Sequence, residues 1–191
     1  MNSAAYTGGA LVLIPNPRDI KDVLKNIDKH RPTIFPGVPA MYIAINNHPD
    51  TPKYNVSSIK ACVSGAAGLP REVQIKFQEL TGAKLVEGYG LSETSPLVTA
   101  NPLFGENRIG TIGVPVADTD VKLVDIETAE KEVPLGEPGE IVIKGPQVMQ
   151  GYWNMPQETA RVLRDGWLYS GDIGVMDADG YIRIVDRKKD M

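Results

Sequence analysis

The sequence predicts an α/β fold: a parallel sheet with flanking helices, followed by a small antiparallel, barrel-like β subdomain. In the first part of the 191-residue chain, short apolar runs alternate with helical patterns, which is typical of a parallel sheet. After about residue 105, short apolar or alternating runs lie between clusters of glycine and proline instead. We therefore predict an α/β subdomain over residues 1–104 and an antiparallel β subdomain over residues 105–185.

Helices and strands alternate in the first subdomain. The apolar run at residues 10–14 predicts a buried strand that stops at Pro15. A helix is expected over residues 18–30, because apolar residues recur there at i, i+3, i+4 and i+7. The other expected strands cover residues 33–35, 59–64 and 84–87, and the other expected helices cover residues 39–46 and 71–80.

The second subdomain is predicted to be almost entirely β structure. Strands are expected at residues 121–124, 140–144, 174–176 and 181–185. Asp177-Ala178-Asp179-Gly180 stands between the last two and is a strong signal for a hairpin turn. One short helix is expected over residues 156–163.

Composition and charge exclude several classes of function. The chain has 20 basic and 24 acidic residues, so it lacks the basic surplus of a nucleic-acid-binding protein. A single cysteine, Cys62, cannot form an internal disulfide, and no cysteine–histidine cluster is present for zinc. No apolar run is long enough to span a bilayer, and the opening residues lack the basic segment of a signal peptide. We therefore expect a cytoplasmic protein.

Residues 88–93, Gly-Tyr-Gly-Leu-Ser-Glu, are the most informative segment. Tyr89 offers a flat face for a purine, and the glycines allow close approach of the backbone. Ser92 can donate a hydrogen bond to a phosphate oxygen, and Glu93 can hold Mg²⁺ beside phosphate. The alternative is a turn from strand to helix, in which Ser92 is the N-cap and Glu93 lies in the first helical turn.

Three further segments are ambiguous when each is taken alone. The small residues at 64–70 suit either a flat ligand or close packing of a helix on the sheet. Asp172 in Tyr169-Ser170-Gly171-Asp172 can accept two hydrogen bonds from a ribose diol or satisfy turn amides. The charged residues 186–191 fit a solvated tail or a chain cut at a boundary.

Taken in order, these segments resemble the adenylate-forming superfamily, which includes acyl-CoA synthetases, luciferases and the adenylation domains of peptide synthetases. The resemblance covers nearly the whole chain with family-like spacing, through residues 64–70, 88–93, 139–152, 169–172 and 186–189. Residues 145–153 look most like the branch of medium- or long-chain fatty-acid–CoA ligases.

The resemblance implies a site for ATP and Mg²⁺. Three small residues would border the adenine: Gly65, Ala66 and Ala67. Tyr89 would stack on the adenine, and Asp172 and Arg187 would bind the ribose hydroxyls. Ser92 stands where the family usually has threonine and would bind phosphate, while Glu93 would hold Mg²⁺, so both would act in catalysis.

The resemblance also implies an acyl pocket and a hinge. Gly90 would border both the nucleotide and the mouth of the acyl pocket, together with Pro96 and Leu97. Residues 186–191 would form a hinge, in which Lys189 matches the position about which the family's C-terminal domain swings. The family's phosphate loop and catalytic lysine have no match here, so we expect an internal piece of a longer enzyme that is inactive alone.

The expected function is therefore part of an ATP-dependent fatty-acid–CoA ligase, which forms an acyl adenylate and then an acyl-CoA. Its substrates would be a fatty acid, ATP and coenzyme A, and no nucleic acid would be involved. Peripheral membrane association of the parent protein and a homodimer are both compatible with this function. Two alternatives remain: an adenylating enzyme for an aromatic or other carboxylic acid, and a non-catalytic nucleotide-binding module.

Overall fold

The computed structural model describes residue 4 and residues 6–188. The chain forms two compact units that divide in sequence between Leu85 and Val86. The predicted subdomain boundary at residue 104 marks a change of pattern along the chain, whereas the compact units divide earlier, within the strand that carries Tyr89. None of the helices in the described part of the chain is long and apolar enough to cross a membrane.

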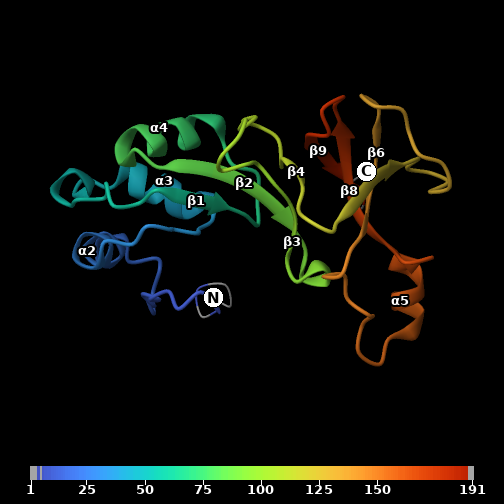
Figure 1. The fold of residues 1–191 in the computed structure, drawn as a ribbon, viewed down its shortest axis with the longest axis horizontal. Coiled ribbons are helices and arrows are strands. Elements are labelled where there is room, and N and C mark those ends of the chain that lie inside the picture. The colour runs from blue at the N-terminus through green and yellow to red at the C-terminus, as the bar shows by residue number, and fades with distance from the viewer. Residues whose placement is uncertain (1–3, 5, 189–191) are drawn as a thin grey trace. The chain divides into compact units, whose positions relative to one another are not determined.

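The first unit contains the three helices that the apolar spacing predicts (Figure 1). They are α2 (Ile20–His30), α3 (Pro39–Asn47) and α4 (Arg71–Thr81), with a 3₁₀ turn, η1 (Thr51–Lys53). Asp19 caps α2 by accepting the amide of Asp22 at 3.1 Å, and Pro39 opens α3. Helix α4 ends at Gly82, whose φ of +73° suits glycine. The buried faces of these helices form one core with β1 (Ala61–Ser64).

Parallel pairing in this unit is confirmed around β1. Two isolated parallel bridges join Ile34 to Ala61 and Gly37 to Ser64, so residues 34–37 run alongside β1, although the strand predicted at residues 33–35 is reduced to these bridges. In the sheet order, β1 is followed by β2 (Lys84–Gly90), which starts in the first unit and continues into the second.

The predicted strand at residues 10–14 is wrong. These residues lie outside any strand, and Leu11, Val12 and Leu13 are 48%, 40% and 72% exposed. An apolar run becomes a strand only where a neighbouring strand satisfies its backbone donors and acceptors. Among residues 4 and 6–188, no strand pairs with residues 10–14, so the run stays irregular.

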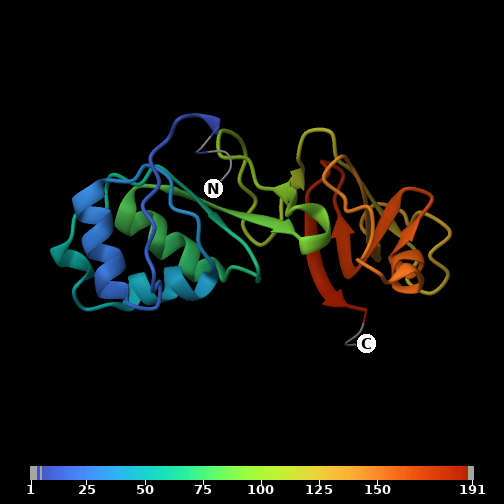
Figure 2. The ribbon, with the colours of Figure 1, turned by 90° about the horizontal axis from the view of Figure 1, so that it is seen from below.

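Antiparallel pairing dominates the second unit, as predicted for the later part of the chain. Strand β2 pairs with β3 (Leu97–Ala100), and β3 pairs with β4 (Val114–Pro115). A five-stranded antiparallel sheet follows, in which β5 (Asp120–Val124), β6 (Pro138–Lys144), β8 (Trp167–Met176) and β7 (Leu163–Arg164) are neighbours in that order. Strand β9 (Ile182–Arg187) pairs with β8, and α5 (Pro156–Val162) precedes β7 (Figure 2).

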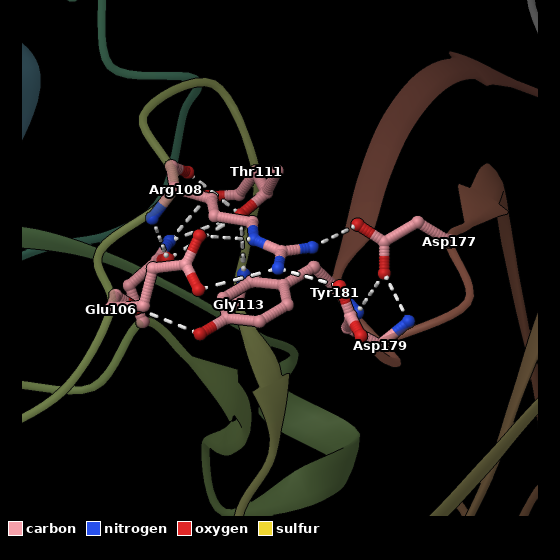
Figure 3. Close-up of polar contacts among 8 residues, drawn as sticks. Glu106, Arg108, Thr111, Gly113, Asp177, Asp179 and Tyr181 are labelled. Atoms are coloured by element: carbon pink, nitrogen blue, oxygen red, sulfur yellow. Dashed lines mark hydrogen bonds and ion pairs between the residues drawn. The ribbon is translucent and has the colours of Figure 1, made fainter.

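The β8–β9 hairpin is anchored at its turn by Arg108 (Figure 3). The guanidinium contacts Asp177 and Asp179 at 2.6 Å each and Glu106 at 2.8 Å. It also lies 4.2 Å from the centre of the Tyr181 ring, and the Tyr181 hydroxyl donates to the Glu106 carbonyl at 2.7 Å. The predicted turn at residues 177–180 is therefore tied to the loop that precedes β4.

Replacing Arg108 with methionine is expected to lower the thermal unfolding midpoint, and the loss should be larger at low salt. Methionine keeps the apolar stem but removes three ion pairs and the cation–π contact, which act together as one network. Arg161→Met is the matched control, because Arg161 makes one exposed ion pair with Glu158. Equal midpoints for the two variants, measured by circular dichroism, would refute this role for Arg108.

Candidate functional site

A pocket of about 530 Å³ lies in the second unit. Its lining joins three segments singled out in the sequence: residues 90–93, residues 169–172 and residues 187–188. Strand β6 contributes Glu140, and the segment after it contributes Tyr152. The volume suits a small-molecule ligand. Residues that are far apart in the sequence, such as Glu93 and Asp172, thus line one cavity.

Asp172 is the buried carboxylate of this pocket. Asp172 is 2% exposed, and its two carboxylate oxygens have different partners. The Tyr89 hydroxyl donates to Oδ2 at 2.6 Å, and Arg187 Nε donates to Oδ1 at 2.9 Å. The register of β8 and β9 places Asp172 directly opposite Arg187, which explains the pairing. A carboxylate held in this way keeps its charge compensated although water has been removed from it.

Tyr89, which is hydrogen-bonded to Asp172, is 8% exposed. Burial, and secondly the hydrogen bond to Asp172, raise the pKa of the Tyr89 phenol well above its usual range. The phenol therefore remains a neutral donor throughout the neutral pH range. This contact with Asp172 is not evident from the sequence, and Tyr89 is not itself among the residues that line the pocket. Stacking of Tyr89 on an adenine stays a prediction.

The connection after β2 differs from a strand-to-helix turn. Gly88, Tyr89 and Gly90 belong to β2, and only the 3₁₀ turn η2 (Ser92–Thr94) separates it from β3. Leu91 occupies the N-cap position, so the alternative in which Ser92 caps a helix is wrong. The Thr94 hydroxyl holds the turn, because it accepts from the Leu91 amide at 2.9 Å and donates to the Pro96 carbonyl at 2.6 Å. Ser92 is exposed at the pocket, where its hydroxyl can meet a ligand.

Glu93 faces the same pocket and is oriented by the segment after β6. The Tyr152 hydroxyl donates to Glu93 Oε1 at 2.7 Å, and the Met149 amide donates to the Glu93 carbonyl at 2.7 Å. Sequence reasoning assigned no role to Tyr152, although it stands in the Gly151-Tyr152 pair that carries the family resemblance. The Tyr152 contact orients the carboxylate of Glu93, and the Met149 contact holds its backbone.

Comparison with known proteins shows the family to which the chain belongs. The family model for the AMP-binding enzyme matches residues 1–153. The chain belongs to the AMP-binding enzyme family. A long-chain-fatty-acid–CoA ligase of Bacillus subtilis is 53% identical over all 191 residues, and a feruloyl-CoA synthase of an Amycolatopsis species is 40% identical over 184 residues. The chain covers 34% and 37% of these two proteins, so it spans about a third of their length.

Solved structures of AMP-binding enzymes have the same fold as this chain. An anthranilate CoA ligase in complex with anthranoyl-AMP superimposes with a TM-score of 0.89 at 32% identity, over 96% of this chain and 35% of that protein. ATP-bound MatB from Rhodopseudomonas palustris superimposes with a TM-score of 0.88 at 32% identity, over 100% of this chain and 37% of its own. The mixed α/β and antiparallel architecture predicted from the sequence is confirmed.

Cationic side chains surround the pocket of this AMP-binding enzyme chain. They are Arg161, Arg164, Arg187 and Lys188. Two of the three acidic lining groups, Glu140 and Asp172, are already paired with Lys188 and Arg187. Glu93 is the third acidic group and pairs with no cation in the described part of the chain. Arg161 pairs with Glu158, so Arg164 is the cation of the lining that balances the carboxylate of Glu93.

Mg²⁺ fits at Glu93 only together with ligand phosphates. The ion is commonly held by one or two carboxylates, with phosphate oxygens and water completing the octahedron. Glu93 supplies one such carboxylate, and the Ser92 hydroxyl lies in the same turn. Within residues 4 and 6–188, no group of three or more His, Cys, Asp or Glu side chains could hold a metal ion without such help.

Of the other predicted site residues, Gly90 lines this pocket and several do not. Gly65, Ala66 and Ala67 follow β1 in the first unit, where the Gly65 amide donates to the Gly37 carbonyl at 3.2 Å. Pro96, in the loop before β3, and Leu97, in β3, are exposed and are not among the lining residues. Lys189 lies outside the described residues. The proposed roles of these residues remain predictions.

The Glu93–Tyr152 contact predicts a measurable titration. The hydrogen bond to Glu93, and secondly burial, raise the pKa of Tyr152 from 10.0 to about 12. Because the folded-state pKa lies above the unfolded one, the stabilisation is complete below pH 10 and is lost as the pH rises towards about 12. In Glu93→Gln, we expect the Tyr152 pKa to fall towards 10.0. Ultraviolet titration of phenolate, with Tyr152→Phe subtracted, measures this change, and an unchanged pKa would contradict the contact.

Proposed function

We propose that this chain is part of an ATP-dependent fatty-acid–CoA ligase, and that the pocket of its second unit binds the AMP part of an acyl adenylate. The arrangement of Asp172 and the Ser92–Glu93 turn in one pocket carries this proposal. A ribose diol and a phosphate with its metal ion need these two kinds of group in a single cavity. A protein that only kept the fold as a scaffold would need neither.

The ribose is assigned to Asp172. A carboxylate has about four lone-pair positions, and two of those on Asp172 are used by Tyr89 and Arg187. Two positions therefore remain for the hydroxyls of a diol. Arg187 is 65% exposed at its side chain, so its guanidinium can shift to donate to the same hydroxyls while Tyr89 keeps the carboxylate in place.

The α-phosphate is assigned to Ser92 and Glu93. A fatty-acid carboxylate attacks the α-phosphorus of ATP, and the bond to pyrophosphate breaks. The thiol of coenzyme A then attacks the acyl carbonyl, and AMP leaves. Mg²⁺ on Glu93 would neutralise charge on the phosphate oxygens, and the Ser92 hydroxyl would donate to one of them. Tyr152 holds Glu93 in position for this role through its hydrogen bond at 2.7 Å.

The remaining predicted residues complete the proposal. Residues 65–67 would border the adenine together with the ring of Tyr89, and Gly90, Pro96 and Leu97 would open towards the acyl chain. Lys189 would be the hinge position. The choice of a fatty acid is supported by the 53% identity to a long-chain-fatty-acid–CoA ligase, against 40% to the feruloyl-CoA synthase, which represents the alternative of an aromatic acid.

Titration calorimetry with two non-hydrolysable adenylates tests this proposal. A dodecanoyl-adenylate analogue should bind this chain more tightly than the acetyl analogue, because the longer chain buries apolar surface beside residues 90–97. Equal affinities would keep the nucleotide site and refute the fatty-acyl assignment. Absence of heat with both would refute a nucleotide half-site in this chain.

A further inference from the structure

A β-bulge in β8 presents Asp172 to the pocket. In the ladder between β6 and β8, Glu140 pairs with Ile173 and Val142 pairs with Tyr169. One residue of β6, Ile141, therefore lies opposite three residues of β8, 170–172. Bulges of this kind interrupt the ladder and redirect a side chain. Here the redirected side chain is the buried carboxylate of the pocket.

Side chains replace the ladder bonds that the bulge removes. The Ser170 hydroxyl donates to the Ile141 carbonyl at 2.7 Å and accepts from the Asp172 amide at 3.1 Å. The Gly171 amide donates to Glu140 Oε1 at 3.1 Å. Gly171 has a φ of +73°, a left-handed conformation that favours glycine. The bulge is thus held by one serine and one glutamate.

Glu140 connects this bulge to the end of β9. The residue is 4% exposed, and Lys188 Nζ contacts its second oxygen, Oε2, at 2.8 Å. The Lys188 amide in turn donates to the Gly171 carbonyl at 2.9 Å. Both backbone polar groups of Gly171 are therefore bonded to this pair of residues. A buried carboxylate with two specific partners is costly unless both partners stay in place.

We propose that Glu140 is a positioning residue for the nucleotide site. It fixes the bulge that aims Asp172 into the pocket, and through Lys188 it holds the end of β9, which carries Arg187, against the same bulge. The link from this geometry to nucleotide binding rests on the proposed function. The geometry itself does not, because the Gly171 amide reports it in the absence of any ligand.

The Gly171 amide in nuclear magnetic resonance spectra of the labelled chain gives the first test. In Glu140→Ala, its hydrogen exchange should become at least about tenfold faster, since the acceptor is lost. In Glu140→Gln, the amide keeps an acceptor, so exchange should stay slow, while its resonance should shift more than that of any other glycine. Glu132→Ala removes an exposed carboxylate paired with Lys122 and should change neither. If Glu140→Ala does not fold, an unmoved Gly171 resonance in Glu140→Gln would overturn the proposal.

AMP affinity, measured by calorimetry well below the unfolding midpoint, gives the second test. We expect at least about tenfold weaker binding in Glu140→Ala, and rescue to within about threefold of wild type in Glu140→Gln. Wild-type affinity in a folded Glu140→Ala variant would overturn the positioning role. If the wild-type chain binds no AMP, the proposed function fails, and the Gly171 amide still decides whether Glu140 holds the bulge.

Discussion

Asp172→Ala is expected to weaken AMP binding to this chain at least about tenfold and to lower the free energy of unfolding by about 1–3 kcal/mol. The affinity falls because the ribose loses its charged acceptor. The stability falls because the Tyr89 hydroxyl, in a residue that is 8% exposed, loses the acceptor to which it donates at 2.6 Å. Calorimetry with AMP and urea denaturation measure the two effects separately.

Two further variants show which property of Asp172 matters. Asp172→Asn keeps the shape and an acceptor for Tyr89 but removes the charge opposite Arg187, so stability should recover more than affinity. Asp120→Ala is the control, because Asp120 is exposed at the start of β5. An AMP affinity in Asp172→Ala equal to that of the control would remove Asp172 from the ribose site.

Gly90→Ala is expected to lower the free energy of unfolding by about 3 kcal/mol or more. A Cβ atom at Gly90 would lie 1.7 Å from the Pro96 carbonyl oxygen and 2.6 Å from its carbon. That carbonyl cannot move away easily, because it accepts from the Leu91 amide at 2.9 Å and from the Thr94 hydroxyl at 2.6 Å. The substitution must therefore open the turn that carries Ser92 and Glu93.

Gly68→Ala is the matched control for Gly90→Ala. No atom lies within 4 Å of a Cβ atom placed at Gly68, and its backbone is not in the left-handed region. Urea denaturation should show little change for this control. Equal unfolding free energies for the two variants would mean that the close approach of β2 to Pro96 is not required by the fold.

Local patterns predicted the elements whose cause is local. Helix α2 was predictable because its apolar residues recur along one face, and its first turn is capped by Asp19. The β8–β9 hairpin was predictable because the turn at residues 177–180 has its own chemistry, in which Asp177 accepts the amides of Asp179 and Tyr181. The anchor that Arg108 adds to this turn comes from 69 residues earlier and leaves no local signal.

Pairing between distant segments explains what the sequence could not predict. The apolar run at residues 10–14 looks like a strand but pairs with no strand in the described part of the chain, whereas Gly88–Gly90 look like a loop but are held in β2 by β3. The candidate site follows the same rule. Ser92, Glu93 and Asp172 stand in recognisable motifs, but the side chains that orient them, Glu140 and Tyr152, are chosen by strand register and by the segment after β6.

Calorimetry with AMP and 2′,3′-dideoxy-AMP tests the central claim most directly. The two ligands share the adenine and the phosphate and differ only in the ribose diol that Asp172 is proposed to bind. We expect AMP to bind this chain at least about tenfold more tightly, since each hydrogen bond to a buried carboxylate contributes about 1.5–3 kcal/mol. Equal affinities for the two nucleotides, or no binding of AMP, would contradict an AMP half-site built around Asp172.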